Sequence, residues 1–199
     1  YRGWASPVWW TRSSSIHFSG VAAITSLDAS VDHDSQGVTI IYAEDATTPL
    51  SWRRLTASDQ TLTASAEVLP AGGGAGAMKG PASLTALPDG RRIVHDFNGP
   101  ANLQGPTVYS QDTAADTWAE LSDDPFPGGT SFISGSIAAL WLRYARGKII
   151  CLITDSANQT HQLASADLGS SFRFVETIAG TAGNQGAGVD VFPDGTILV

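Results

Sequence analysis

Four segments of the sequence share one pattern: an apolar run, a tight turn that contains glycine, and a second apolar run. The segments are residues 31–45, 84–98, 142–156 and 189–199. Their turn glycines are Gly37, Gly90, Gly147 and Gly195, separated by 53, 57 and 48 residues. Runs of this length bounded by glycine turns are typical of β-hairpins. The repeat therefore predicts an all-β chain built from similar units.

A second landmark follows each of the first three turns at a nearly constant distance. Asp59, Asp112 and Asp167 come 22, 22 and 20 residues after their turn glycines. Each unit then has room for four short strands, which in the second unit we expect at 82–87, 91–97, 106–110 and 117–121. Units of four strands repeating every 40 to 50 residues or so are typical of β-propeller blades.

We therefore predict a β-propeller of four-stranded antiparallel blades, with about four blades' worth of chain. The expected division is a half blade at 1–20, blades at 21–70, 71–124 and 125–180, and a half blade at 181–199. Either the two halves join to close a four-bladed ring, or residues 1–199 are a fragment of a six- or seven-bladed propeller. The apolar final residues "TILV" would leave an unpaired strand edge, which favours the fragment.

Composition excludes several classes of protein. The net charge is −8 and the only lysines are Lys79 and Lys148, whereas nucleic-acid binding normally needs a basic surface. The single cysteine, Cys151, excludes an internal disulfide framework. The apolar runs are shorter than the roughly 20 residues of a membrane helix, so we expect no membrane span.

One short motif carries a family resemblance. Residues Ser165, Asp167, Gly169 and Phe172 fit S-x-D-x-G-x-x-[W/F], and this loop resembles the Asp-box of BNR or sialidase-type β-propellers. A weaker copy has Ser110, Asp112 and Trp118, with Ala114 in place of glycine, and a third has Ser58 and Asp59. The carboxylate can accept hydrogen bonds from N–H groups of its own loop, and glycine permits positive φ. We interpret the motif as structural.

The resemblance also implies which face carries function. In the family, the Asp-box turn joins the third and fourth strands, opposite the ligand site. This leaves the loops between blades and those after the second strands, where acidic residues recur at Glu44, Asp45, Asp96 and Asp155. They could form a rim that binds a cation or sugar hydroxyls. The alternative is that each carboxylate only starts its own loop.

Other candidates have simpler interpretations. Asp28, Ser30, Asp32 and Asp34 share one strand face by their spacing of two. This suggests either a calcium site or a solvated or axial-channel face, and we expect no other cofactor. The pairs Arg53–Arg54 and Arg91–Arg92 are expected on solvated strand faces. His95 and Asp96 are adjacent, and neighbours on a strand point to opposite faces. We identify no catalytic residue.

Two functions are compatible with these features. The first is a non-enzymatic Asp-box propeller, a structural or recognition module of a surface assembly such as a phage tail, a tail fibre or a secreted adhesin. It would contact protein subunits or cell-surface glycans through its loops, and its location would be extracellular or on a virion. The alternative is a sialidase-type glycoside hydrolase, or a non-catalytic portion of one.

Overall fold

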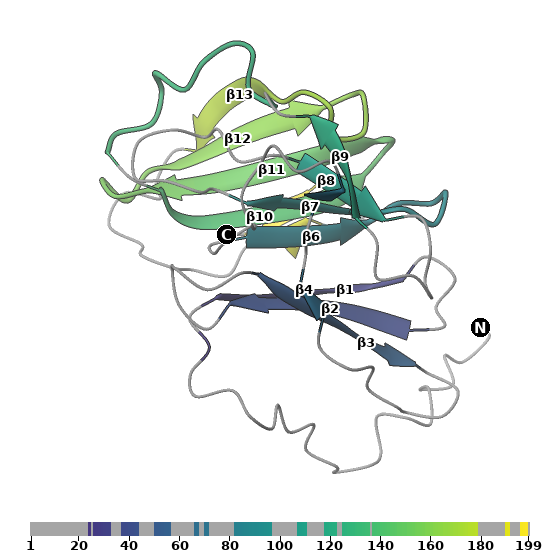
Figure 1. Cartoon of the computed structure of the whole chain (residues 1–199). Coiled ribbons are helices and arrows are strands. Elements are labelled where there is room, and N and C mark those ends of the chain that lie inside the picture. Colours follow the sequence, from purple (N-terminus) through teal and green to yellow (C-terminus); the bar gives the residue numbers. More distant parts are fainter. Residues whose placement is uncertain are drawn as a thin grey trace, which may run out of the picture.

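The computed structural model confirms an all-β architecture. It describes residues 24, 26–32, 37–43, 50–56, 66–67, 70–71, 82–96, 107–110, 118–122, 125–135, 137–178, 190–191 and 196–198. Within these ranges the chain forms strands and turns and no helix (Figure 1). The pairings are antiparallel except for one short parallel pair, between residues 70–71 and 118–119.

The first sheet has the order β1-β2-β3-β4. Its strands are β1 (Ser26–Val31), β2 (Gly37–Ala43), β3 (Ser51–Thr56) and β4 (Ala66–Glu67). The second sheet has the order β5-β9-β8-β7-β6. Its strands are β5 (Pro70–Ala71), β6 (Ala82–Ala86), β7 (Arg92–Asp96), β8 (Thr107–Ser110) and β9 (Trp118–Ser122). The last four agree with the strands predicted for the second unit to within one residue at each end.

The third sheet has the order β10-β11-β12-β13 and contains the two longest of the described strands, β10 and β11. Its strands are β10 (Ile137–Ala145), β11 (Lys148–Asp155), β12 (Thr160–Ser165) and β13 (Arg173–Ile178). The hairpin β10–β11 turns at Arg146 and Gly147, whose φ values of 51° and 75° make a tight turn. A two-stranded sheet follows, formed by β14 (Asp190–Val191) and β15 (Ile197–Leu198).

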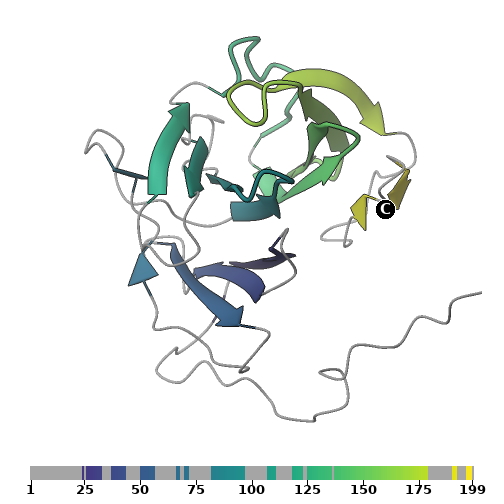
Figure 2. The same ribbon diagram turned by 90° about the vertical axis from the view of Figure 1, so that its right-hand side faces the viewer.

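Successive sheets meet through one edge strand of each. β1 lies against β6, β6 against β10, and β10 against β14, and Figure 2 shows the sheets set around a common centre. The number of blades in the intact protein and the closure of the ring remain predictions.

At the first two of these junctions, backbone N–H groups of one edge strand donate to side-chain oxygens of the preceding one. Leu84 and Ala86 of β6 donate to Asp28 Oδ2 (3.0 Å) and Ser30 Oγ (3.1 Å) of β1, and Leu142 and Tyr144 of β10 donate to Ser83 Oγ (2.8 Å) and Thr85 Oγ1 (3.0 Å) of β6.

Two apolar layers fill the spaces between the larger sheets. One joins the first and second sheets and contains Ile41, Trp52, Leu84 and Trp118. The other joins the second and third sheets and contains Ile93, Leu142, Leu163 and Phe172, with Phe126 from the segment before β10. Each buried side chain of this size stabilises the fold by about 1.5 to 3 kcal/mol. The packing of these side chains therefore holds neighbouring sheets together.

The expectation of a solvated face is wrong for Arg92. This side chain is only 1% exposed, and its guanidinium lies 5.3 Å from the Trp52 ring and 5.8 Å from the Trp118 ring. Its Nη1 also donates to Thr39 Oγ1 at 3.1 Å. The two tryptophan faces replace the hydration that a charge in a sheet interior loses. Arg54 is also largely covered, since its Nε lies 2.6 Å from Asp32 Oδ2.

Candidate binding groove

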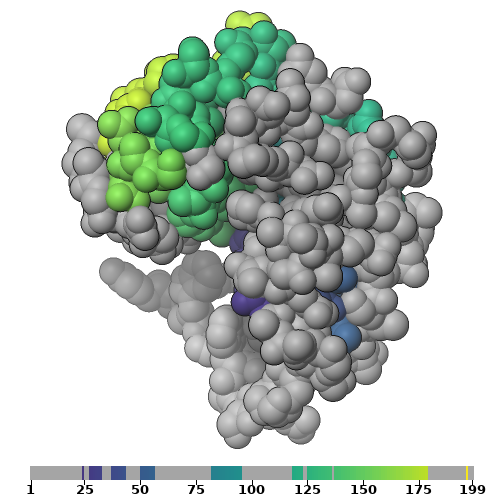
Figure 3. Space-filling view, turned by 60° about the vertical axis from the view of Figure 1, so that its left-hand side comes forward, coloured from purple at the N-terminus to yellow at the C-terminus, as the bar shows by residue number. Residues whose placement is uncertain are grey.

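The segment 125–135 runs beside β12 and β13, and Figure 3 shows its atoms next to those strands at the upper left of the molecule. Three hydrogen bonds fix it to the third sheet. The Phe172 N–H donates to the Pro125 carbonyl (2.6 Å), the Ser134 N–H donates to Asp155 Oδ2 (2.9 Å), and Ser156 Oγ donates to the Ser134 carbonyl (3.1 Å). Both ends of the segment are thereby anchored.

A groove of about 710 Å³ lies between this segment and the two strands. It is lined by Pro127, Gly128, Gly129, Ser131, Phe132, Leu163, Phe172, Arg173 and Phe174. Sites that bind small molecules are concave, mostly apolar, and of roughly 300 to 1,000 Å³. The groove has the size and lining of such a site.

Two phenylalanines form its exposed aromatic surface. The rings of Phe132 and Phe174 stack, with centroids 4.7 Å apart and planes at 27°. Phe174 is 45% exposed, although apolar side chains of this size are usually buried. Deeper in the groove, Phe172 stacks on Phe126 at 5.5 Å within the core between the second and third sheets. A core-anchored ring therefore supports the exposed pair.

Arg173 connects the groove to a second hollow. This hollow, of about 430 Å³, is lined by Lys148, Ala164, Ala166, Asp167, Ser171, Arg173 and Val175. Arg173 and Lys148 are both exposed, and Asp167 is bonded to its own loop, as described below. The end of the groove beside Arg173 therefore presents two cationic side chains.

A buried polar network lies beneath the aromatic pair. His161 Nε2 lies 3.1 Å from Asp155 Oδ2, and His161 Nδ1 lies 3.0 Å from Thr177 Oγ1. The imidazole packs against Phe132, with ring centroids 5.4 Å apart. The network joins β11, β12 and β13 below the groove, so it holds the aromatic surface in place.

Asp155 is the centre of that network. Its Oδ1 accepts the N–H groups of Ala157 and Gln159 at 2.9 and 3.0 Å, and its Oδ2 accepts Ser134 N–H and faces His161. Burial alone would raise the pKa of Asp155, but the hydrogen bonds from Gln159, His161 and Ser134 outweigh burial and lower the pKa. The carboxylate is fully buried, which leaves it no exposed surface for a ligand.

The Asp-box loop between β12 and β13 bonds to itself in the same way. Ser165 Oγ donates to Asp167 Oδ1 (2.6 Å) and accepts the Gly169 N–H (2.8 Å), and Asp167 also accepts the N–H and hydroxyl of Ser171 at 2.9 and 2.6 Å. Burial would raise the pKa of Asp167, but these bonds lower it. Gly169 has a φ of 105°, which other residues rarely adopt. Phe172 then enters the core.

The structure describes only part of the predicted site residues. Glu44, Asp45, Ser58, Asp59 and Asp112 lie outside the described residues, as do the side chains of Asp96 on β7 and Ser110 on β8. Trp118 is buried, with its ring 5.7 Å from that of Trp52. Of the predicted acidic rim, Glu44, Asp45 and Asp96 remain predictions, as do the two weaker Asp-box copies, whereas Asp155 is buried and bonded to its own loop.

The groove residues Phe132, Arg173 and Phe174 were not among the residues singled out from the sequence. The available signal was the alternation in "FRFVE". It places Phe172 and Phe174 on one face at the start of a strand and Arg173 on the other. The meeting of Phe174 with Phe132 depends on the segment 125–135, which precedes β10 in the sequence and is hydrogen-bonded to Phe172, Asp155 and Ser156. The local sequence does not encode that meeting.

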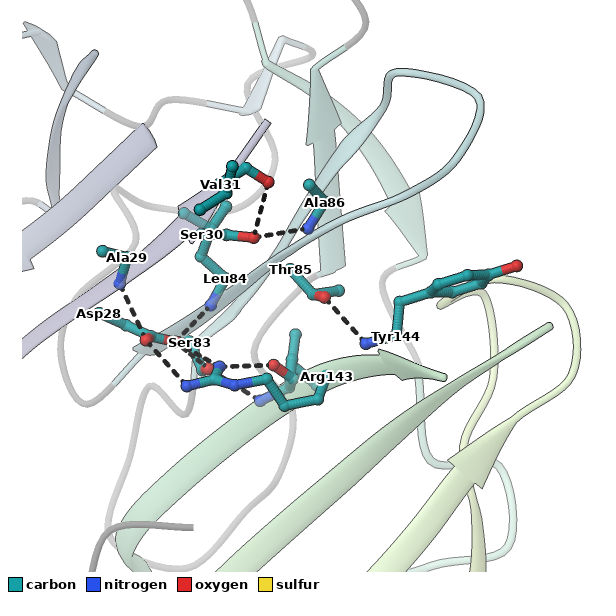
Figure 4. Close-up of polar contacts among 11 residues, drawn as sticks. Asp28, Ala29, Ser30, Val31, Ser83, Leu84, Thr85, Ala86, Arg143 and Tyr144 are labelled. Atoms are coloured by element: carbon teal, nitrogen blue, oxygen red, sulfur yellow. Dashed lines mark hydrogen bonds and ion pairs between the residues drawn. The ribbon is translucent and has the colours of Figure 1, made fainter. Parts of the chain in front are cut away.

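The possible calcium face is occupied by protein groups. Asp32 accepts from Thr39 Oγ1 (2.7 Å) and from Arg54, and Asp28 accepts from groups on β6 and β10 (Figure 4). Asp34 lies outside the described residues. Across the described ranges, no group of three or more His, Cys, Asp or Glu side chains is placed to hold a metal ion. The described ranges also contain no helix that is long and apolar enough to cross a membrane.

No protein-family model matches the sequence, and no curated protein matches it. Among solved structures, Trypanosoma rangeli sialidase bound to a difluoro-KDN compound matches at 12% identity and a TM-score of 0.47, over 76% of this chain and 27% of that chain. The same enzyme with sialic acid matches at 12% and 0.47, over 80% and 29%. A structure of prolyl endopeptidases matches at 13% and 0.44, over 84% and 21%.

The chain thus spans less than a third of each of these proteins. The activities in their names belong to those proteins.

Proposed function

We propose that this chain is a recognition module that binds a carbohydrate in the groove between segment 125–135 and strands β12 and β13. The observation that carries the proposal is the exposed face of Phe174, stacked on Phe132 inside a concavity of about 710 Å³. A sugar ring has an apolar face of C–H groups that packs on an aromatic ring, while its hydroxyls need polar partners. Ser131 and the loop backbone lie in the groove to provide them.

The charge at one end of the groove favours an acidic sugar. Arg173 lines both hollows, and Lys148 lines the second. A guanidinium binds a carboxylate through two parallel hydrogen bonds, and lysine adds a point charge. A glycan that carries a carboxylate or sulfate near the ring in contact with Phe174 matches this arrangement.

The hydrogen bonds of Asp155, Asp167 and Asp28 favour binding over hydrolysis by these three carboxylates. Asp155 and Asp167 accept hydrogen bonds from their own loops, and Asp28 accepts from neighbouring strands. Glycoside hydrolysis needs a pair of carboxyl groups that flank the scissile bond. The three carboxylates named here already have protein partners. We propose recognition within a surface assembly, extracellular or on a virion, as the role of the groove.

A glycan array followed by titration calorimetry tests the proposal. We expect the unmodified chain to prefer acidic over neutral glycans. Phe174→Leu keeps an apolar side chain but removes the ring. It should weaken binding by about two- to tenfold, since aromatic contacts contribute about 0.5 to 1.5 kcal/mol beyond area. Phe174→Tyr should bind within about threefold of the unmodified chain. Arg173→Gln should remove the preference for acidic glycans.

Glu176→Gln is the matched control, because this exposed residue lies on the same strand and lines neither hollow. Equal binding by the Phe174→Leu variant and the unmodified chain would contradict the groove as the site. Release of the aryl group from a panel of aryl glycosides and sialosides would favour the glycoside hydrolase instead.

A further inference from the structure

The buried network beneath the groove ends at the hydroxyl of an exposed residue. Thr177 lies on β13 and is exposed, and its Oγ1 is 3.0 Å from His161 Nδ1. The imidazole is 1% exposed, and its Nε2 is 3.1 Å from Asp155 Oδ2. Three neighbouring strands therefore supply a chain of contacts from a buried carboxylate, through a buried imidazole, to a hydroxyl on an exposed residue.

The partners of Asp155 fix the positions of the protons in this chain. Burial raises the pKa of this carboxyl, but its hydrogen bonds outweigh burial and lower the pKa, so it is ionised at neutral pH. An ionised carboxylate only accepts hydrogen bonds, so His161 Nε2 carries a proton and donates it to Oδ2. In the neutral imidazole Nδ1 is then an acceptor, and the Thr177 hydroxyl donates to it.

A hydroxyl bonded in this way is arranged as an activated nucleophile. A hydroxyl is a weak nucleophile unless a base takes its proton during the attack, and a third group must orient that base. The distances of 3.0 and 3.1 Å lie within the range of about 2.6 to 3.2 Å that such proton transfer requires. The burial of the imidazole also keeps its proton transfer away from bulk water.

A β-bulge in β13 brings the hydroxyl to the groove face. On β12, Leu163 pairs with Phe174 and His161 pairs with Thr177, so two residues of β12 span three of β13. The extra residue places Phe174 and Thr177 on the same face of the sheet, although they are three positions apart. Bulges that re-aim a side chain occur frequently next to active sites.

The hydroxyl therefore adjoins the aromatic surface of the groove. The His161 ring lies 5.4 Å from the Phe132 ring and 6.4 Å from the Phe174 ring, and Thr177 contacts the same imidazole from β13. Thr177 is not part of the groove lining. A sugar ring stacked on Phe174 can thus direct a substituent beyond the groove toward this hydroxyl.

The edge of β13 offers donors for a developing negative charge. Within the described sheets, β13 pairs on its β12 side only, so alternate N–H groups point outward from its other edge. Backbone N–H groups near the reacting carbon stabilise the negative oxygen of a tetrahedral intermediate. Acyl transfer to a hydroxyl requires such donors, a base and a nucleophile, and it does not require the carboxyl pair of a glycoside hydrolase.

We propose that Thr177 is the nucleophile of an acyl-transfer site that removes ester-linked acyl groups from the carbohydrate in the groove. Thr177 Oγ1 attacks the ester carbonyl carbon, and its proton moves to His161 Nδ1. The bond from the acyl carbon to the sugar oxygen then breaks, the sugar oxygen takes the proton from Nδ1, and the acyl group stays on Thr177. Water attacks this acyl group by the same route, which releases a carboxylic acid and restores the hydroxyl. The carbohydrate as substrate rests on the proposed function, whereas the nucleophile does not.

A fluorophosphonate probe tests the nucleophile without any sugar. Thr177 Oγ1 should displace fluoride from phosphorus, and peptide mass spectrometry should locate one adduct on Thr177. Thr177→Val keeps the branched shape but removes the hydroxyl. It should abolish the adduct and slow the hydrolysis of p-nitrophenyl acetate by at least about 100-fold, the lower end of what a positioned base contributes. Thr177→Ser keeps the hydroxyl and should retain hydrolysis within about tenfold.

Glu176→Gln is the matched control, because this exposed neighbour pairs with Gln162 and points to the opposite face. It should react like the unmodified chain, and an unchanged melting temperature of Thr177→Val should show that this variant is folded. The absence of an adduct on Thr177, or equal hydrolysis by Thr177→Val and the unmodified chain, would overturn the proposal and leave the network a structural one.

An O-acetylated acidic glycan tests the substrate. The unmodified chain should release acetate from it, and Thr177→Val should bind the glycan but release none. An adduct on Thr177 without acetate release would overturn the carbohydrate ester as the substrate. Glycan binding that Phe174→Leu does not weaken, together with an adduct on Thr177, would contradict the groove alone. Glycan binding without an adduct would contradict the acyl-transfer site alone.

Discussion

Replacing Asp155 by asparagine removes the negative charge of this side chain but keeps its size and shape. The amide oxygen can keep the bonds to Ala157 and Gln159, while the amide nitrogen meets the Ser134 N–H, so that two donors face each other. The charge-assisted contact with buried His161 is also lost. Net bonds to a charged group contribute about 1.5 to 3 kcal/mol. We expect Asp155→Asn to lower the free energy of unfolding by about 2 to 3 kcal/mol at pH 7.

The pH dependence of this loss of unfolding free energy tests how much of it comes from the charge of Asp155. Asp155 has a lowered pKa in the folded state, so its ionised form stabilises the fold above the unfolded pKa of about 3.9, and this stabilisation disappears as the pH falls through the folded pKa. The difference between the two proteins should therefore be constant from pH 5 to 7 and shrink below about pH 4.

Urea unfolding followed by tryptophan fluorescence at several pH values measures this difference. Asp89→Asn is the control, because Asp89 is exposed and its bond to Arg91 lies at the surface, where a change of within about 0.5 kcal/mol is expected. A difference of the same size at pH 3 and pH 7 would refute the electrostatic reasoning and assign the loss to packing.

Two further substitutions test the loop and the core. Asp167→Ala removes the acceptor of Ser165 and Ser171. It should lower the free energy of unfolding in urea by about 1 to 2 kcal/mol and make the loop easier for a protease to cut. An unchanged unfolding curve would contradict a structural role for this loop. Phe172→Ala should lower the free energy of unfolding by about 3 to 5 kcal/mol because its ring is buried in the core. Phe174→Ala should lower it by less than about 1 kcal/mol because its ring is half exposed. Similar losses for the two variants would contradict the surface position of Phe174.

The elements that the sequence predicts well depend on local signals. The strands of the second unit follow from alternating apolar residues and from Gly90, which has a φ of 89° in its turn. The Asp167 loop is similarly local, since its bonds join residues at most four positions apart.

The elements that the sequence does not reveal depend on contacts between sheets. Arg92 is buried because Trp52 and Trp118 approach it from two other strands, and a charged residue on a strand otherwise favours a solvated position. Phe132 and Phe174 meet because the Phe172 N–H binds the Pro125 carbonyl. No local sequence pattern predicts the contact of Arg92 with the two tryptophans or that of Phe132 with Phe174.

The donors at the sheet junctions are backbone groups, and this has an evolutionary consequence. Any residue except proline supplies the same N–H, so a strand can change its side chains at residues 84, 86, 142 or 144 without losing these bonds. The acceptors are side chains, and Leu84 and Leu142 are buried between the sheets. Tandem copies of one sheet can therefore diverge most freely at the half-buried donor positions 86 and 144, where only the backbone N–H is needed.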